Sequence, residues 1–235
     1  MMERPAFREV TPQQLVGPLN SLEQKHSPTA LYIAGTLAIP LVHPRVAIVG
    51  TRSPSAEGFR IASELAAEIS RQQVTVVSGL ARGIDTTAHR AAISAGGRTV
   101  AVLGTPLSRV YPVENSELQA EIMRSHLAVT EFPENSPTLP GNFVRRNRTM
   151  ALIADASVIV ESGEGGGSLN QGWETLRLGR PLFIHTKEFE RKGLDWPAKM
   201  ARYGAIRFRE PSDVMDLLTS ASPSPEVAAS VLETT

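Results

Sequence analysis

Three short segments rich in glycine, serine and arginine have the composition of phosphate-binding turns. Each follows a short apolar run, and they are residues 50–54 (GTRSP), 78–83 (SGLARG) and 161–168 (ESGEGGGS). Glycines let backbone N–H groups approach an anion, and the N-terminus of a following helix favours negative charge. A phosphate group is therefore the expected ligand. Tight turns between a strand and a helix also need glycine for its positive φ, so a purely structural role stays open for each glycine.

The common nucleotide-binding motifs are missing from these turns. The sequence has no G-x-x-x-x-G-K-[ST] motif, and GTRSP does not match G-x-G-x-x-G. Because those motifs cradle phosphates in ATPases and dinucleotide-binding enzymes, ATP hydrolysis and ordinary dinucleotide binding are disfavoured. The turns favour a protein that binds phosphates by other means.

A further segment, residues 140–148 (PGNFVRRNR), places arginines beside an aromatic residue. Cations that follow a nucleic-acid backbone, next to a ring that stacks on a base, are typical of single-stranded DNA sites. Phe143 would supply the ring, and Arg145, Arg146 and Arg148 the cations. In the alternative, Phe143 belongs to the hydrophobic core and the arginines lie on a solvated helix face.

Ser78, Asp85 and His89 could be drawn as a catalytic triad, since Asp85 and His89 lie one turn apart on a predicted helix. No G-x-S-x-G motif accompanies them. We instead expect Asp85 to brace the helix start and His89 to hold the loop. The chain has no cysteine, and its five histidines show no metal-binding spacing. The sequence thus predicts no catalytic residue, metal or cofactor.

The charges of the chain balance, with 24 Lys and Arg against 24 Asp and Glu. A neutral chain argues against a uniformly basic nucleic-acid coat but is compatible with a local patch. Only four of the 24 cations are lysines, and the planar arginine side chain suits phosphates and bases. An arginine-rich background composition would look the same. We expect a confined pocket rather than a basic surface.

The composition, 41% hydrophobic and 20% charged, is that of a globular protein. The N-terminus is charged, and no segment approaches the roughly 20 consecutive apolar residues of a membrane span. We therefore expect no secretion signal, no membrane association and a cytoplasmic location.

From residue 45 onward, short apolar runs alternate with amphipathic segments. The predicted strands are residues 45–49, 74–77, 99–103, 128–130, 157–160 and 181–184. The predicted helices are residues 56–71, 84–95, 115–124, 143–154 and 169–178. Continuously apolar strands are buried on both faces. The alternation predicts an α/β fold with a doubly wound, mostly parallel sheet, in which ligands bind at the carboxyl ends of the strands.

We divide the chain into three parts. Residues 1–44 form an N-terminal extension with a short helix over 13–24 and a lead-in strand over 30–34. Residues 45–219 form the main domain. Residues 220–235, rich in Ser, Pro and Ala, form a flexible tail.

Five collinear blocks resemble the DNA-processing protein A family, also called Smf. They are residues 46–52 (VAIVGTR), 76–89 (VVSGLARGIDTTAH), 99–115 (TVAVLGTPLSRVYPVEN), 131–148 (EFPENSPTLPGNFVRRNR) and 166–169 (GGSL). SGLARGID and NFxRRNR are highly specific to that family. The resemblance implies an extended Rossmann-like domain that binds single-stranded DNA in a basic pocket and forms homodimers. It also implies protection of single strands during DNA uptake or recombination, help in loading a RecA-type recombinase, and no catalytic activity.

The turns and the resemblance together give a set of DNA- or phosphate-binding residues. They are Gly50, Thr51, Arg52, Ser78, Gly79, Arg82, Asn142, Phe143, Arg145, Arg146, Arg148, Gly167 and Ser168. By the resemblance, Phe143 contacts bases, while the three arginines that follow it contact phosphates or brace the pocket.

The chain departs from the family at both ends and at one turn. Too few residues precede Arg45 for the family's helical N-terminal domain, and the sequence ends before a winged helix, so we expect the core domain alone. The usual SGSLITA is GGSLNQG here (166–172), and residues 185–208 lack the usual glycine-rich ending. A paralogue that handles plasmid or phage DNA is compatible with these departures.

The alternative function is that of a nucleotide-processing enzyme similar to the lonely-guy phosphoribohydrolases. Their P-G-G-x-G-T-x-x-E turn has a partial counterpart in residues 165–168. However, Asn170 and Gln171 stand where an acidic catalytic residue is expected, and Glu174 lies one turn too far along. A third possibility is a sensor that binds a small nucleotide without turnover.

Overall fold

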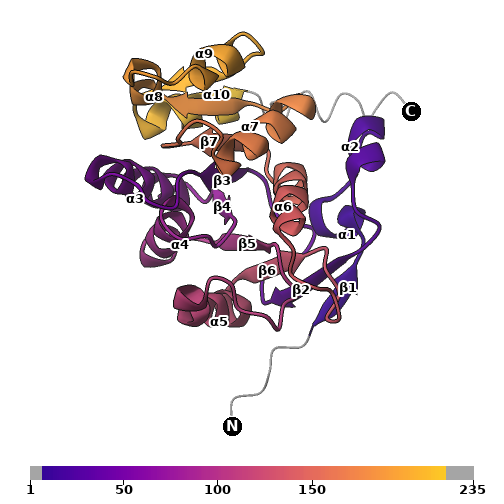
Figure 1. The fold of residues 1–235 in the computed structure, drawn as a ribbon. Coiled ribbons are helices and arrows are strands. Elements are labelled where there is room, and N and C mark those ends of the chain that lie inside the picture. Colours follow the sequence, from indigo (N-terminus) through magenta and orange to yellow (C-terminus); the bar gives the residue numbers. More distant parts are fainter. Residues whose placement is uncertain (1–6, 221–235) are drawn as a thin grey trace.

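The computed structural model describes residues 7–220. Its nine strands form one sheet in the order β1-β2-β6-β5-β4-β3-β7-β8-β9 (Figure 1). The strands are β1 (Arg8–Val10), β2 (Leu31–Gly35), β3 (Arg45–Val49), β4 (Thr75–Ser78), β5 (Thr99–Leu103), β6 (Leu127–Thr130), β7 (Ala156–Ile159), β8 (Leu182–His185) and β9 (Ile206–Phe208). Neighbours from β6 to β9 are parallel, whereas β1 and β2 are antiparallel additions at one edge.

Helices cover both faces of this sheet. They are α1 (Pro12–Val16), α2 (Ser21–His26), α3 (Ala56–Arg71), α4 (Ile84–Ser94), α5 (Ser116–Ser125), α6 (Pro140–Ile153), α7 (Gly167–Arg177), α8 (Thr186–Glu190), α9 (Trp196–Ala201) and α10 (Pro211–Ser220). Figure 1 shows α3, α4 and α5 on one side of the sheet and α1, α2 and α6 on the other. None of the described helices is both long and apolar enough to span a bilayer.

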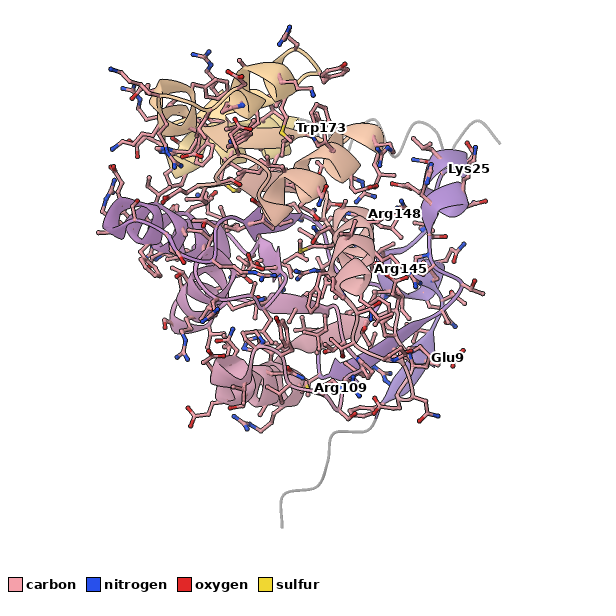
Figure 2. All side chains as sticks on the ribbon, viewed as in Figure 1. Glu9, Lys25, Arg109, Arg145, Arg148 and Trp173 are labelled. Atoms are coloured by element: carbon pink, nitrogen blue, oxygen red, sulfur yellow. The ribbon has the colours of Figure 1, made fainter. Side chains whose placement is uncertain are left out.

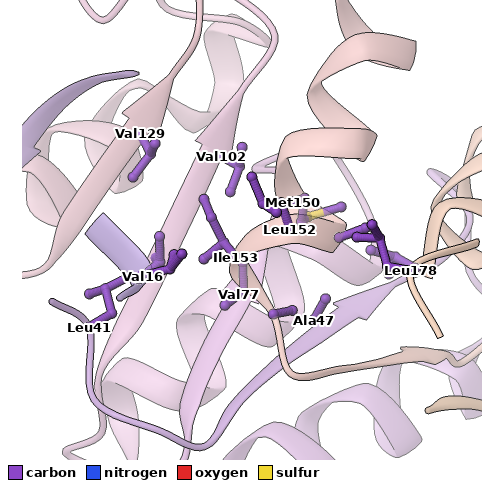
Figure 3. Packing of buried hydrophobic residues seen from close by; sticks show 14 of the residues in the cluster. Val16, Leu41, Ala47, Val77, Val102, Val129, Met150, Leu152, Ile153 and Leu178 are labelled. Carbon is purple, nitrogen blue, oxygen red and sulfur yellow. The ribbon is translucent and has the colours of Figure 1, made fainter. Parts of the chain in front are cut away.

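Strand β3 shows why the sheet is covered twice. Successive side chains of a strand point to opposite faces. Val46 and Ile48 pack in one core with α3 and α4. Ala47 and Val49 belong to the other core, together with Met150 of α6 (Figure 3). The predicted doubly wound, mostly parallel α/β fold is confirmed.

The single helix predicted over residues 13–24 is wrong, because α1 and α2 are separate. Gly17 ends α1 with a φ of +93°, and Pro18 follows it. Each helix has its own capping box, formed by Thr11 with Gln14 and by Asn20 with Glu23. These caps satisfy backbone N–H groups at two separate helix starts. A continuous helix would have only one start and would need no second cap.

The structure also contains elements that were not predicted. Strands β1 and β9 have three residues each, too few to show a hydrophobic period. The segment 185–208, which departs from the family pattern, forms α8, α9 and β9. The predicted tail, residues 220–235, lies outside the described residues apart from Ser220, which ends α10.

Arg45 joins the N-terminal extension to the sheet through buried polar contacts. Its side chain is 2% exposed, and its Nη2 lies 2.8 Å from Oδ1 of Asp155. Nη1 donates to the carbonyl oxygens of Val16 and Leu41. Burial alone would raise the pKa of the Asp155 carboxyl, but hydrogen bonds from Arg45 and its positive charge hold that pKa below its usual value.

Replacing Asp155→Ala is expected to lower the free energy of unfolding by about 3 kcal/mol, because the buried guanidinium of Arg45 loses its counter-charge. A carboxyl whose pKa is lowered by folding stabilises the protein above its unfolded pKa, and this contribution is lost as pH falls below about 4. Urea unfolding should therefore show a smaller difference between variant and wild type at pH 3 than at pH 7. A difference that does not change with pH contradicts this account.

Candidate nucleic-acid interface

Two hollows lie next to each other at the carboxyl ends of the central strands. The first, here called the glycine hollow, has a volume of about 420 Å³ and is lined by residues from 49–52, 162–171 and α6. The second, the tyrosine hollow, has a volume of about 310 Å³ and is lined by residues from 79–82, 110–114 and α6. Arg52, Phe143 and Arg146 line both hollows. The three predicted phosphate-binding turns therefore meet at one edge of the sheet.

Arg146 belongs to the wall that the two hollows share. It is 6% exposed, and its Nη1 donates to the carbonyl oxygen of Val102 in β5 at 3.0 Å. Its Nε is buried and has no hydrogen-bond partner among the described residues. A Cβ on Gly79 would lie 1.4 Å from Nη1, so this guanidinium fits only because residue 79 is glycine. Gly79 thus has a packing role in addition to any contact with a ligand.

Asp85 is the buried acidic residue that offsets this cation. Its Oδ2 accepts hydrogen bonds from the backbone N–H groups of Gly79 at 3.2 Å and Ala81 at 3.3 Å. Burial raises the pKa of the Asp85 carboxyl, against the attraction of Arg146 and these N–H donors. Burial likewise lowers the pKa of Arg146, against the attraction of Asp85. Asp85 therefore supports the turn before α4 and the cation, whereas the sequence predicted only that it braces the helix start.

The structure does not assemble Ser78, Asp85 and His89 into a triad. The Ser78 hydroxyl donates to the carbonyl oxygen of Ile48 at 2.7 Å. Nδ1 of His89 lies 2.7 Å from the Thr99 hydroxyl, and burial lowers the pKa of His89 to about 3. A neutral imidazole bonded to Thr99 cannot activate a serine whose hydroxyl is directed elsewhere.

Two aromatic rings lie together at the tyrosine hollow. The half-buried ring of Phe143 packs so closely on Gly104 that a Cβ there would lie 2.6 Å from Cδ1 of the ring. The ring centroids of Phe143 and Tyr111 are 5.1 Å apart, and Tyr111 is 46% exposed. Phe143 therefore packs on Gly104 and lines both hollows, while its contact with a base stays a prediction.

The arginines of α6 separate into one that lines the hollows and two that do not. Arg145 pairs with Glu131 at 2.9 Å, and Arg148 pairs with Glu174 at 3.5 Å. Both are about half exposed or more, and neither lines a hollow. Both labels stand beside α6 in Figure 2. Helical spacing places Arg146 on the side of Phe143 and directs the other two away from it.

Arg52 and Arg82 lie at the rims of the hollows. Arg52 is exposed, and within residues 7–220 its guanidinium makes no hydrogen bond or ion pair. Arg82 lies 3.5 Å from the carboxylate of Glu114, and both residues line the tyrosine hollow. Arg52 is thus the cation most open to an incoming anion.

The remaining predicted residues divide in the same way. Gly50, Thr51, Gly167 and Ser168 line the glycine hollow. Asn142 does not, because it is buried and its side-chain amide donates to the carbonyl oxygen of Pro137 at 2.9 Å.

The sequence prediction missed Asn147 and Tyr111. Asn147 lines the glycine hollow and donates from Nδ2 to the carbonyl oxygen of Gly167 at 3.1 Å, which ties α6 to the start of α7. Its position one turn after Phe143 was a usable signal. Tyr111 had no comparable signal beyond its place in a family-like block.

The comparisons with known proteins agree with this architecture. A family model described as DNA recombination-mediator protein A matches residues 11–219. The protein Smf of Escherichia coli is 34% identical over 215 residues, which are 91% of this chain and 56% of that protein. The chain thus spans little more than half the length of this relative.

Two solved structures are similar to this one. The structure of DNA processing protein A of Streptococcus pneumoniae has a TM-score of 0.75 to this one at 29% sequence identity. The match covers 89% of this chain and 74% of the Streptococcus pneumoniae chain. DNA processing protein A of Helicobacter pylori, described for its unique single-stranded DNA binding mode, gives a TM-score of 0.78 at 22% identity. That match covers 92% of this chain and 97% of the other.

Gly79→Ala is expected to destabilise the protein by about 1–3 kcal/mol, because the new methyl group displaces the guanidinium of Arg146. In an Arg146→Met background the same substitution should cost less, since the displaced group is gone. Urea unfolding of the wild type, the two single variants and the double variant measures the coupling energy between residues 79 and 146. Equal costs in both backgrounds would show that Gly79 is required for another reason.

Proposed function

Because the chain belongs to the DNA recombination-mediator protein A family, we propose that it binds single-stranded DNA across the glycine and tyrosine hollows. The observation that carries this proposal is the buried guanidinium of Arg146 beside the ring of Phe143, in a wall that both hollows share. A DNA backbone that passes Arg52 and Arg146 brings its phosphates to cations and its bases to an aromatic ring.

The shape of the interface supports single strands over duplexes. Each hollow has the size of a small-molecule site, about 420 and 310 Å³, and so accepts individual nucleotides. A ring that lines a hollow reaches the face of a base only when the base is unstacked from its neighbours. Bases in a duplex are stacked and paired, so their faces are closed to Phe143.

We propose that the site binds without catalysis. A phosphoribohydrolase-like reaction needs a carboxylate directed at the ligand. The acidic side chain that lines the glycine hollow is Asp85, and its Oδ2 is held by the N–H groups of Gly79 and Ala81. Glu174 pairs with Arg148 and Arg177 instead. Release of free base from a nucleoside 5′-monophosphate would overturn this part of the proposal.

The family also suggests a cellular role. We propose that residues 45–219 carry the DNA site, and that the protein acts in the cytoplasm as a homodimer. In this role it protects single strands and assists a RecA-type recombinase in DNA uptake or recombination. Family membership is the support for these points.

Arg52→Ala is expected to weaken binding of a dT oligonucleotide about tenfold, because one charge-assisted phosphate contact is lost. The slope of log affinity against log salt should become shallower by about 0.7, the value for one phosphate of a single strand. Fluorescence anisotropy at several salt concentrations measures both changes. Arg71→Ala, at an exposed arginine at the end of α3, is the matched control and should change neither. Equal effects of the two substitutions would contradict the proposed site.

Phe143→Leu is expected to weaken oligonucleotide binding about fivefold or more, because leucine fills the space on Gly104 but offers no flat face to a base. The salt slope should stay at the wild-type value, since no cation is lost. The same anisotropy titration separates this loss from that of Arg52→Ala. A changed slope with unchanged affinity at low salt would show that Phe143 acts on the charges and not by stacking.

A further inference from the structure

The loop that borders the tyrosine hollow exposes several apolar side chains in one place. Val110, Tyr111 and Val113 are 38%, 46% and 73% exposed, and all three line this hollow. Val113 is the most exposed of the large hydrophobic residues in the described part of the chain. A cluster of exposed apolar groups at a hollow marks a surface that a ligand covers.

Side-chain hydrogen bonds hold this loop in place before any ligand arrives. Asn115 donates from Nδ2 to the carbonyl oxygen of Leu80 and to the hydroxyl of Thr86, each at 2.8 Å. Gln119 donates from Nε2 to the carbonyl oxygen of Leu107 at 3.1 Å. The loop is thus tied to the turn after β4 and to α5. Such a preformed surface avoids the entropic cost of ordering on binding.

We propose that the tyrosine hollow is a second base-binding subsite, in which the base adjoining the one in the glycine hollow stacks on Tyr111 and covers Val113. This inference rests on the proposed function. Its support is continuity, since Arg52, Phe143 and Arg146 line both hollows. A phosphate beside Arg146 joins a nucleotide in one hollow to its neighbour in the other. Stacking on Tyr111 accepts any base, so this subsite adds affinity for length rather than for sequence.

Glu114 opposes DNA at this subsite. Its carboxylate holds Arg82 at 3.5 Å on the same hollow, and both side chains are more than half exposed. A nucleotide bound on Tyr111 brings its next phosphate towards this pair. The phosphate then replaces the Glu114 carboxylate as the partner of Arg82. Removal of the Glu114 charge should therefore strengthen binding of strands that reach the subsite.

The test measures binding of oligothymidylates of one to four nucleotides, in competition with a labelled dT strand. For the wild type, we expect affinity to rise once a second base is present. Tyr111→Ala should remove this rise, a loss of about fivefold or more, whereas Tyr111→Phe should keep it. Thymidine 5′-monophosphate should bind equally to both variants, which shows that the glycine hollow is intact.

Two further variants keep the test decisive if Tyr111→Ala also disturbs Phe143. Val113→Asp should weaken binding of the tetranucleotide. Val42→Asp is the control and should leave this binding unchanged, because Val42 is 58% exposed and lines neither hollow. Glu114→Gln should strengthen binding of the tetranucleotide and steepen the slope of log affinity against log salt by about 0.7.

The outcomes separate this inference from the proposed function. Wild-type binding of the tetranucleotide by Tyr111→Ala and Val113→Asp overturns the second subsite. If Arg52→Ala still weakens binding in that case, the proposed function stands. If the wild type binds no oligothymidylate, or Arg52→Ala has no effect, the proposed function itself fails.

Discussion

The burial of one charged side chain, Arg146, constrains most of the interface. A buried guanidinium is costly unless other groups compensate it. Val102 supplies a carbonyl acceptor, Asp85 a nearby negative charge, and Gly79 the space in which the guanidinium lies. The turn after β4, the end of β5 and the face of α6 are fixed relative to one another by this single group. Phe143, three residues earlier on α6, is positioned by the same packing.

This arrangement is compatible with the proposed phosphate contacts in a chain with no net charge. The exposed cations near the hollows are mostly neutralised by carboxylates, as in the pairs of Arg145 with Glu131 and Arg148 with Glu174. Of the cations that line the hollows, Arg52 has no carboxylate partner among the described residues, Arg146 is offset by Asp85, and Arg82 is paired with Glu114. Because Arg146 is buried, its charge acts at a lower effective dielectric than the charge of the exposed Arg52.

The sequence predicted the fold class and the edge of the sheet where the two hollows lie, because buried parallel strands and glycine turns have strong local patterns. It could not decide which arginine of α6 faces the hollows, since that choice depends on how α6 packs against β5 and α7. The break between α1 and α2 was readable from Gly17 and Pro18, which interrupt the helix predicted over residues 13–24. Tyr111 was missed because a single exposed aromatic residue has no pattern of its own. The three-residue strands at the two edges of the sheet, β1 and β9, were too short for any periodic signal.

The central claim is that single-stranded DNA contacts the buried Arg146. Its Nε is buried and has no partner among the described residues, so its N–H signal reports on any change of surroundings at the guanidinium. We would record the arginine Nε–Hε spectrum of 15N-labelled protein during titration with a dT oligonucleotide and assign Arg146 through Arg146→Lys. A shift of the Arg146 signal with the single strand, but not with a duplex of equal length, is the predicted result. A spectrum in which the signals of Arg145 and Arg148 shift while that of Arg146 stays fixed would contradict the account.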